Sequence, residues 1–152
     1  MLLRIEKSPD RDVVLDQEGC AEALQRALEL EGVREPVEIT VLVTDDETIR
    51  SLNSRFRGID APTDVLSFPA EEQASQGAQP DHPFVTPPED RHLGDIAVSY
   101  PRALRQAAER GWSVQEEIRF LLVHGLLHIL GYDHATRRGQ AAMARREAEI
   151  LG

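Results

Sequence analysis

The chain has 152 residues, of which 17 are Lys or Arg and 27 are Asp or Glu, so its formal net charge is −10. This is the length of one ordinary domain, and we expect a single domain over residues 1–152. The acidic balance argues against a protein that coats nucleic acid non-specifically. The longest apolar stretch, residues 120–130, is too short to span a membrane.

Apolar spacing along the chain predicts strands and helices in mixed order. In chain order we expect a strand at 2–5, a helix at 16–31, a strand at 37–43, a helix from a capping box at Thr44 to near Gly58, strands at 64–68 and 94–99, and helices at 101–111, 113–130 and 137–151. The last helix is expected to bury Ala141, Met143, Ala144, Ala148 and Leu151. This order predicts an α+β fold, a small mixed sheet of about four strands with helices packed on it.

Two segments stand out from this pattern. The helix at 113–130 begins at a capping box, Ser113 with Glu116, and is apolar almost all round, so we expect it to be central and buried. Residues 71–92 lack periodicity and are predicted to form a long surface loop, for which we favour mobility over function. Within that loop, His82 and His92 are expected to be solvated.

Cys20 is the only cysteine, so no internal disulfide is possible. We expect it to be a small core residue on the first helix. The first residues lack the basic and apolar regions of a signal peptide. Both features fit a cytoplasmic protein.

The central helix carries a pattern of histidines that is typical of a metal site. His124 and His128 are four residues apart, so their side chains share one helix face, about 5–6 Å apart at Cβ. Gly131 can end the helix, which lets His134 supply a third ligand. Three protein ligands leave a fourth position for water, as in a catalytic zinc site, so we predict one Zn²⁺ per chain. Three core histidines without a metal are the less favoured alternative, because an unpartnered buried imidazole costs about 1–3 kcal/mol.

The spacing His-x-x-x-His-x-x-Gly-x-x-His is also that of the metzincin proteases. In those enzymes the residue after the first histidine is a glutamate that acts as general base. Here it is Gly125, which has no side chain to move a proton. A metallopeptidase or another zinc hydrolase is therefore an alternative function, not the preferred one.

Two arginines, Arg55 and Arg57, lie at the end of the second helix, next to a strand. They are candidates for an anion contact. On the residues alone, a simple interaction with the helix dipole is the preferred interpretation.

Together, residues 52–69, 93–96 and 124–134 resemble the YbeY family of bacterial endoribonucleases, also described as rRNA maturation factors. The resemblance implies zinc on His124, His128 and His134, and cleavage of single-stranded RNA. It implies maturation of the 3′ end of the small-subunit (16S) rRNA and a role in ribosome quality control. No membrane partner is expected, because no apolar stretch is long enough to span a membrane. The resemblance also implies three partners: rRNA, a small-subunit ribosomal protein and an Era-type GTPase. Arg57 matches the family's phosphate-binding arginine, whereas Arg55 is a weaker candidate.

The implied mechanism assigns Arg57 and His124 as candidate catalytic residues. The ion would make its bound water more acidic or polarise a phosphoryl oxygen, and Arg57 would stabilise the developing charge. The general base is open, with Asp64 and Asp95 as candidates, whereas Asp133 could orient an imidazole. A non-enzymatic alternative is a ribosome assembly factor in which zinc is structural.

Overall fold

The computed structural model describes residues 1–8, 13–70, 91–133 and 135–152. These residues form the strands β1 (Leu2–Lys7), β2 (Glu38–Thr44), β3 (Val65–Pro69) and β4 (His92–Ser99), and the helices α1 (Gln17–Leu30), α2 (Asp46–Arg57), α4 (Tyr100–Arg110), α5 (Val114–Ile129) and α6 (Arg137–Leu151). All but two residues of the predicted loop at 71–92 lie outside the described residues.

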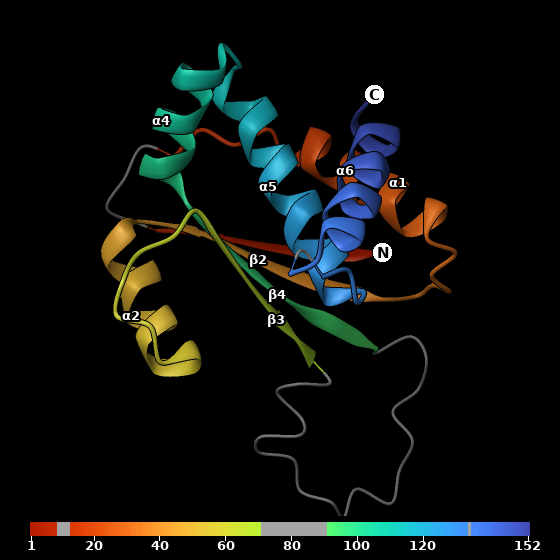
Figure 1. Cartoon of the computed structure of the whole chain (residues 1–152), viewed down its shortest axis with the longest axis horizontal. Helices are drawn as coiled ribbons and strands as arrows, with labels where there is room; N and C mark the ends of the chain where they lie inside the picture. The colour runs from red at the N-terminus through yellow and green to blue at the C-terminus, as the bar shows by residue number, and fades with distance from the viewer. Residues whose placement is uncertain (9–12, 71–90, 134) are drawn as a thin grey trace, which may run out of the picture.

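The four strands form one mixed sheet in the order β1-β2-β4-β3. β1 and β4 pair with β2 in parallel, and β3 pairs with β4 in antiparallel fashion at one edge. Figure 1 shows α1, α5 and α6 on one side of this sheet and α2 on the other. The predicted α+β class and four-stranded mixed sheet are confirmed.

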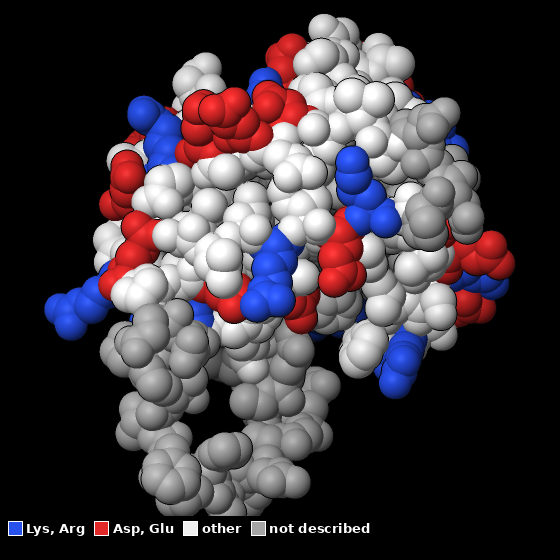
Figure 2. Space-filling view, turned by 180° about the vertical axis from the view of Figure 1, so that it is seen from behind, with Lys and Arg blue, Asp and Glu red and all other residues white. Residues whose placement is uncertain are grey.

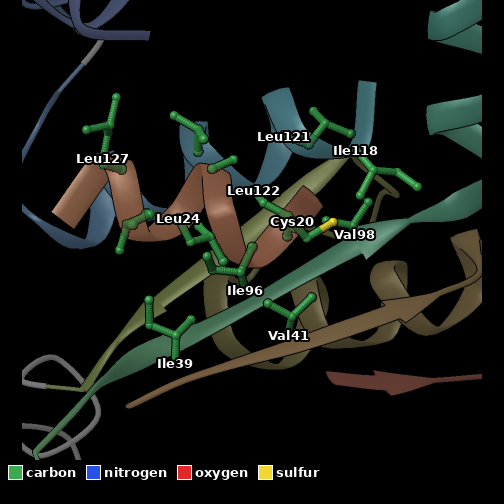
Figure 3. Close-up of a cluster of buried hydrophobic side chains, with 14 of the residues drawn as sticks. Cys20, Leu24, Ile39, Val41, Ile96, Val98, Ile118, Leu121, Leu122 and Leu127 are labelled. Carbon is green, nitrogen blue, oxygen red and sulfur yellow. The ribbon is translucent and has the colours of Figure 1, made fainter. Parts of the chain in front are cut away.

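The main core lies between the sheet and the pair α1 and α5 (Figure 3). Ile39 and Val41 of β2 point towards these helices because strand side chains alternate between the two faces. Leu122 and Leu126 of α5 are completely buried, which confirms the predicted central position of that helix. Each such side chain stabilises the fold by about 1.5–3 kcal/mol relative to an exposed one.

A smaller core lies on the other face, under α2. It contains the buried residues Ile49, Leu66 and Ala97, with partly buried neighbours at its margin. Phe56 has the helical spacing of this apolar face, yet 48% of its surface is exposed. The helix α2 therefore covers only part of this face of the sheet.

Three details of the predicted elements are wrong. Asp45, not Thr44, caps α2, and its side chain accepts a hydrogen bond from the Thr48 N–H at 2.8 Å. Thr44 instead ends β2, where it pairs with Ser99. The strand predicted at 94–99 begins two residues earlier, at His92, because residues from there on pair with β2.

The buried face of α6 also differs from the prediction. Met143 is buried as expected, but its buried companions are Glu147 and Ile150 rather than the predicted alanines and Leu151. Positions 143, 147 and 150 form one helical stripe, which includes a carboxylate among apolar residues. No described helix is long and apolar enough to cross a membrane.

Candidate active site

Two of the predicted metal ligands converge on α5. The Nε2 atoms of His124 and His128 are 3.3 Å apart, and their rings meet edge to face at 76°. Two nitrogens that each bind a tetrahedral ion at about 2.0–2.1 Å are separated by about 3.3 Å. The pair is therefore spaced for a single ion, and imidazole nitrogen is a donor that zinc prefers.

His124 is held from behind by Glu147 of α6. The Nδ1 atom of His124 lies 3.2 Å from Oε1 of Glu147, which is a buried side chain. A proton on Nδ1, donated to this carboxylate, leaves the lone pair of Nε2 free for a metal. Glu147 was not among the predicted site residues, although an acidic residue four positions after Met143, on the apolar face of α6, was a signal that could have indicated it.

The third predicted ligand, His134, lies outside the described residues. Within the described ranges, no group of three or more His, Cys, Asp or Glu side chains is placed to hold a metal. Gly131 has the positive φ (106°) that was predicted to end the helix and turn the chain towards position 134. The described part of the site thus consists of two donors.

An open cleft of about 430 Å³ joins the histidine pair to the segment after α2. Its lining comprises Arg57, Thr63, Asp64, Val65, Leu66, Ser67, His124, Gly125 and His128. The two constellations that were separate in the sequence, the histidines and the Arg57 segment, therefore share one cleft.

Arg57 reaches this cleft from the last turn of α2, across the edge strand β3. Its Nη2 donates to the backbone carbonyl of Ser67, and its guanidinium lies 5.3 Å from the centre of the Phe68 ring. Gly58, in the left-handed conformation (φ 71°), ends the helix directly after it. The side chain is thus placed by contacts with β3, beyond any interaction with the helix dipole.

Gly125 explains how α5 comes so close to the sheet. A Cβ atom added there would lie 2.9 Å from Cγ2 of Ile96 and 3.5 Å from Cγ2 of Val65. Ile96 is completely buried and β-branched, so it has little freedom to move away. A glutamate at this position, as in the metzincins, has no space in this packing.

Of the three candidate acids, only Asp64 lines the cleft. Its Oδ1 accepts a hydrogen bond from the Val65 N–H at 2.8 Å. Asp95 lies on β4 with its Oδ1 2.9 Å from Nε2 of His92, and Asp133 accepts from the Ala135 N–H at 2.8 Å. Of the two described imidazoles of the site, that of His124 contacts a carboxylate, which belongs to Glu147.

Two further predictions concern residues away from the cleft. Arg55 is not among the cleft residues, and its guanidinium lies 5.2 Å from the centre of the Phe56 ring. The side chain of His92 is 32% exposed and lies beside Asp95 and Glu38, so it is solvated only in part, whereas His82 lies outside the described residues.

Two buried ionisable groups have shifted pKa values. Burial raises the pKa of the Cys20 thiol to about 11, so it is protonated and unreactive, as expected of a core residue. Burial also raises the pKa of Glu117 on α5, although Arg110, 3.4 Å away, acts in the opposite direction. Neither group is among the residues that line the cleft.

Figure 2 shows how charged side chains are distributed on one face of the molecule. On the face seen in Figure 2, Lys and Arg stand singly among acidic and uncharged side chains, without a continuous basic area among the described residues. With a net charge of −10, affinity for a polyanion would have to come from a few local arginines or from a partner, and not from the surface as a whole.

The chain is similar to known proteins over nearly its whole length. A model of the family Endoribonuclease YbeY matches residues 6–152. The Endoribonuclease YbeY of Roseiflexus castenholzii is 45% identical over 156 residues, which cover 100% of this chain and 92% of that protein. The one from Moorella thermoacetica is 49% identical over 129 residues, or 84% of this chain and 80% of that protein.

A solved structure shares the fold. The solution structure of TM1509 from Thermotoga maritima matches with a TM-score of 0.60 at 25% identity, over 99% of this chain and 87% of that one. With the family model spanning residues 6–152 and relatives above 40% identity, the chain belongs to the Endoribonuclease YbeY family.

Proposed function

We propose that this protein is a zinc-dependent endoribonuclease that cleaves single-stranded RNA in the cleft between α5 and β3. The observation that carries the proposal is the meeting of two convergent histidines with Arg57 in one cleft. The relatives named Endoribonuclease YbeY support the RNA substrate.

The residues have distinct roles in this proposal. His124, His128 and His134 would hold one Zn²⁺, which when bound acidifies water or polarises a phosphoryl oxygen. Glu147 keeps the proton of His124 on Nδ1 and fixes the orientation of the ring. Arg57 contacts the scissile phosphate through its planar fork and stabilises the charge that develops there. Asp64, the described carboxylate in the cleft, accepts a proton from the nucleophile.

We also propose a cellular role in the maturation of ribosomal RNA. The RNA is the small-subunit (16S) rRNA near its 3′ end, processed in the cytoplasm as part of ribosome maturation and quality control. Because the chain is acidic overall, part of the affinity for a ribosomal substrate comes from protein partners. A small-subunit ribosomal protein and an Era-type GTPase are the proposed partners.

One experiment separates this function from its alternatives. The purified protein is incubated with a short single-stranded RNA and with casein, each with and without a chelator, beside a His128→Ala control. We expect chelator-sensitive cleavage of RNA alone. Chelator-sensitive cleavage of casein would favour a metallopeptidase. Zinc-dependent folding without either cleavage would favour an assembly factor with structural zinc.

A further inference from the structure

A second hollow lies on the face of the sheet opposite α5, between the sheet and α2. This groove has a volume of about 240 Å³ and is lined by Thr40, Leu42, Leu52, Phe56, Phe68, Asp95, Ile96 and Ala97. It is the uncovered margin of the small core under α2, which explains why Phe56 is exposed. We call it the aromatic groove.

The size of the aromatic groove restricts what it can hold. Pockets for drug-sized ligands usually measure about 300–1,000 Å³. A groove of about 240 Å³ with two aromatic side chains in its wall suits a single flat ring system. Phe56 and Phe68 meet edge to face, with their ring centres 5.5 Å apart, so they present a fixed aromatic corner.

Positive charge borders this corner. The guanidinium of Arg55 lies over Phe56 at 5.2 Å, and that of Arg57 lies over Phe68 at 5.3 Å. Aromatic side chains flanked by arginines are the usual means of binding single-stranded nucleic acid, since bases stack on the rings and phosphates pair with the guanidinium groups.

Arg57 also connects the aromatic groove to the cleft. It lines the cleft beside His124 and His128, while its guanidinium covers Phe68 of the groove wall. A strand whose phosphate lies on Arg57 can therefore send one neighbouring nucleotide over the edge strand β3 into the groove. This continuity singles out the same polyanion as the occupant of both hollows.

We propose that the aromatic groove binds one unpaired nucleobase of the RNA strand that is cleaved in the cleft, an inference that rests on the proposed nuclease function. The base packs against Phe56 and Phe68. Asp95, which lines the groove, accepts a hydrogen bond from an exocyclic amino group, which favours adenine, cytosine or guanine over uracil. The groove thus positions the strand and gives the site a preference for sequence.

The test measures binding of short 2′-O-methylated RNA strands, whose integrity is checked on a gel, to the zinc-loaded protein. One strand is intact, and the others each lack a single base at successive positions. The wild-type protein is compared with Phe56→Ala. The control is Leu104→Ala, an apolar residue on α4 with 44% exposure that does not line the groove.

We expect Phe56→Ala to weaken binding of the intact strand by about fivefold to a hundredfold, and Leu104→Ala to leave it unchanged. At one position, loss of the base should weaken wild-type binding by a similar factor and abolish the difference between wild type and Phe56→Ala. A Phe56→Ala effect that persists at every position, or no effect at all, would overturn the inference. If the wild-type protein still cleaves unmodified RNA with zinc, the proposed nuclease function survives that result; if it neither binds nor cleaves RNA, both fall.

Discussion

The two faces of the sheet differ in how completely they are covered, and the site divides between them. The face under α1 and α5 is fully packed, with Leu122, Leu126 and Ile96 completely buried. The face under α2 has a small core and leaves Phe56 exposed at the margin. The convergent histidines belong to the packed side, whereas Arg57 comes from the sparsely covered side.

This division suits the chemistry of each part. Metal ligands must be held within a fraction of an ångström, and packed helices provide that precision. A polymer substrate needs an accessible surface with charged and aromatic groups, which a thinly covered sheet face offers. A substitution on one side can therefore be compared with a matched substitution on the other.

Loss of a ligand on the packed side should remove the metal. His128→Ala should reduce bound zinc from about one ion per chain to almost none, because the remaining ligands hold an ion poorly. Elemental analysis of the purified proteins measures this. His92→Ala, on β4 beside Asp95, is the control and should keep its zinc. Equal zinc in both variants would mean that the ion is bound elsewhere or not at all.

On the sparsely covered side, Arg57→Ala should impair catalysis and leave the metal in place. One group that stabilises transition-state charge is worth roughly a hundredfold in rate, so RNA cleavage should fall by about that factor. Zinc content should not change, since a guanidinium is not a metal ligand. Arg55→Ala, which alters the neighbouring charge outside the cleft, should have a smaller effect on the rate. Normal cleavage by a folded Arg57→Ala protein would assign the phosphate to another residue.

Substitution of Glu147 tests whether the orientation of the His124 ring depends on α6 as well as on α5. Glu147→Ala should weaken zinc affinity by about 10- to 100-fold, because His124 loses the acceptor of its Nδ1 proton. Glu147→Gln keeps an acceptor oxygen and should restore most of the affinity. Competition with a chelator gives the dissociation constants. Glu149→Ala, at an exposed position of α6, is the control and should leave the zinc affinity unchanged. If Glu147→Ala also left the zinc affinity unchanged, His124 would not need this carboxylate to bind the ion.

Glu147 also shows what the sequence could and could not reveal. The histidine pair was predictable because spacing along one helix fixes which side chains are neighbours. The contact between His124 and Glu147 joins residues 23 positions apart on two helices, so it depends on how α6 packs against α5. The predicted buried face of α6 consisted largely of alanines. Because alanine is small, it occurs at exposed helix positions as readily as at buried ones, so it did not identify the buried face.

The same distinction applies to the fold. Alternation in β2 and the apolar pattern of α5 predicted burial correctly, because each follows from local periodicity. Capping at Thr44 was predicted one residue too early, since pairing with β4 extends β2 through that residue. The aromatic groove was not predicted, because exposure of Phe56 depends on how much of the sheet one helix covers.

The close approach of α5 to the sheet can be tested at Gly125. The added methyl group of Gly125→Ala would meet Ile96 at 2.9 Å, and such overpacking usually costs about 1–3 kcal/mol. The higher helix propensity of alanine returns up to about 1 kcal/mol, so a net loss of up to roughly 2 kcal/mol is expected. Denaturant unfolding in the presence of chelator measures it. The control, Ser54→Ala on the exposed face of α2, should change the free energy of unfolding by no more than about 0.5 kcal/mol. An equally small change for Gly125→Ala would mean that the packing between α5 and the sheet can accommodate a methyl group.

A smaller effect is expected at Glu117, a completely buried carboxylate on the packed side. Its pKa is raised in the folded protein, mainly by burial and against the opposing influence of Arg110. At a pH between the pKa of Glu117 in the unfolded chain and its higher pKa in the folded protein, the unfolded state binds fewer protons than the folded state. The free energy of unfolding therefore falls as the pH rises through this range. Glu117→Gln cannot ionise and should not show this loss.

The measurement for Glu117 compares melting temperatures of the wild type and Glu117→Gln from pH 4 to pH 8, with chelator present so that zinc binding adds no pH dependence of its own. The two proteins should melt at similar temperatures at pH 4, and the variant should become relatively more stable as pH rises. The opposite trend would mean that the ion pair with Arg110, at 3.4 Å, outweighs the cost of burying the charge. The packed side would then stabilise an ionised carboxylate, and the cost of burying a charge would not by itself explain why Arg57 comes from the sparsely covered side.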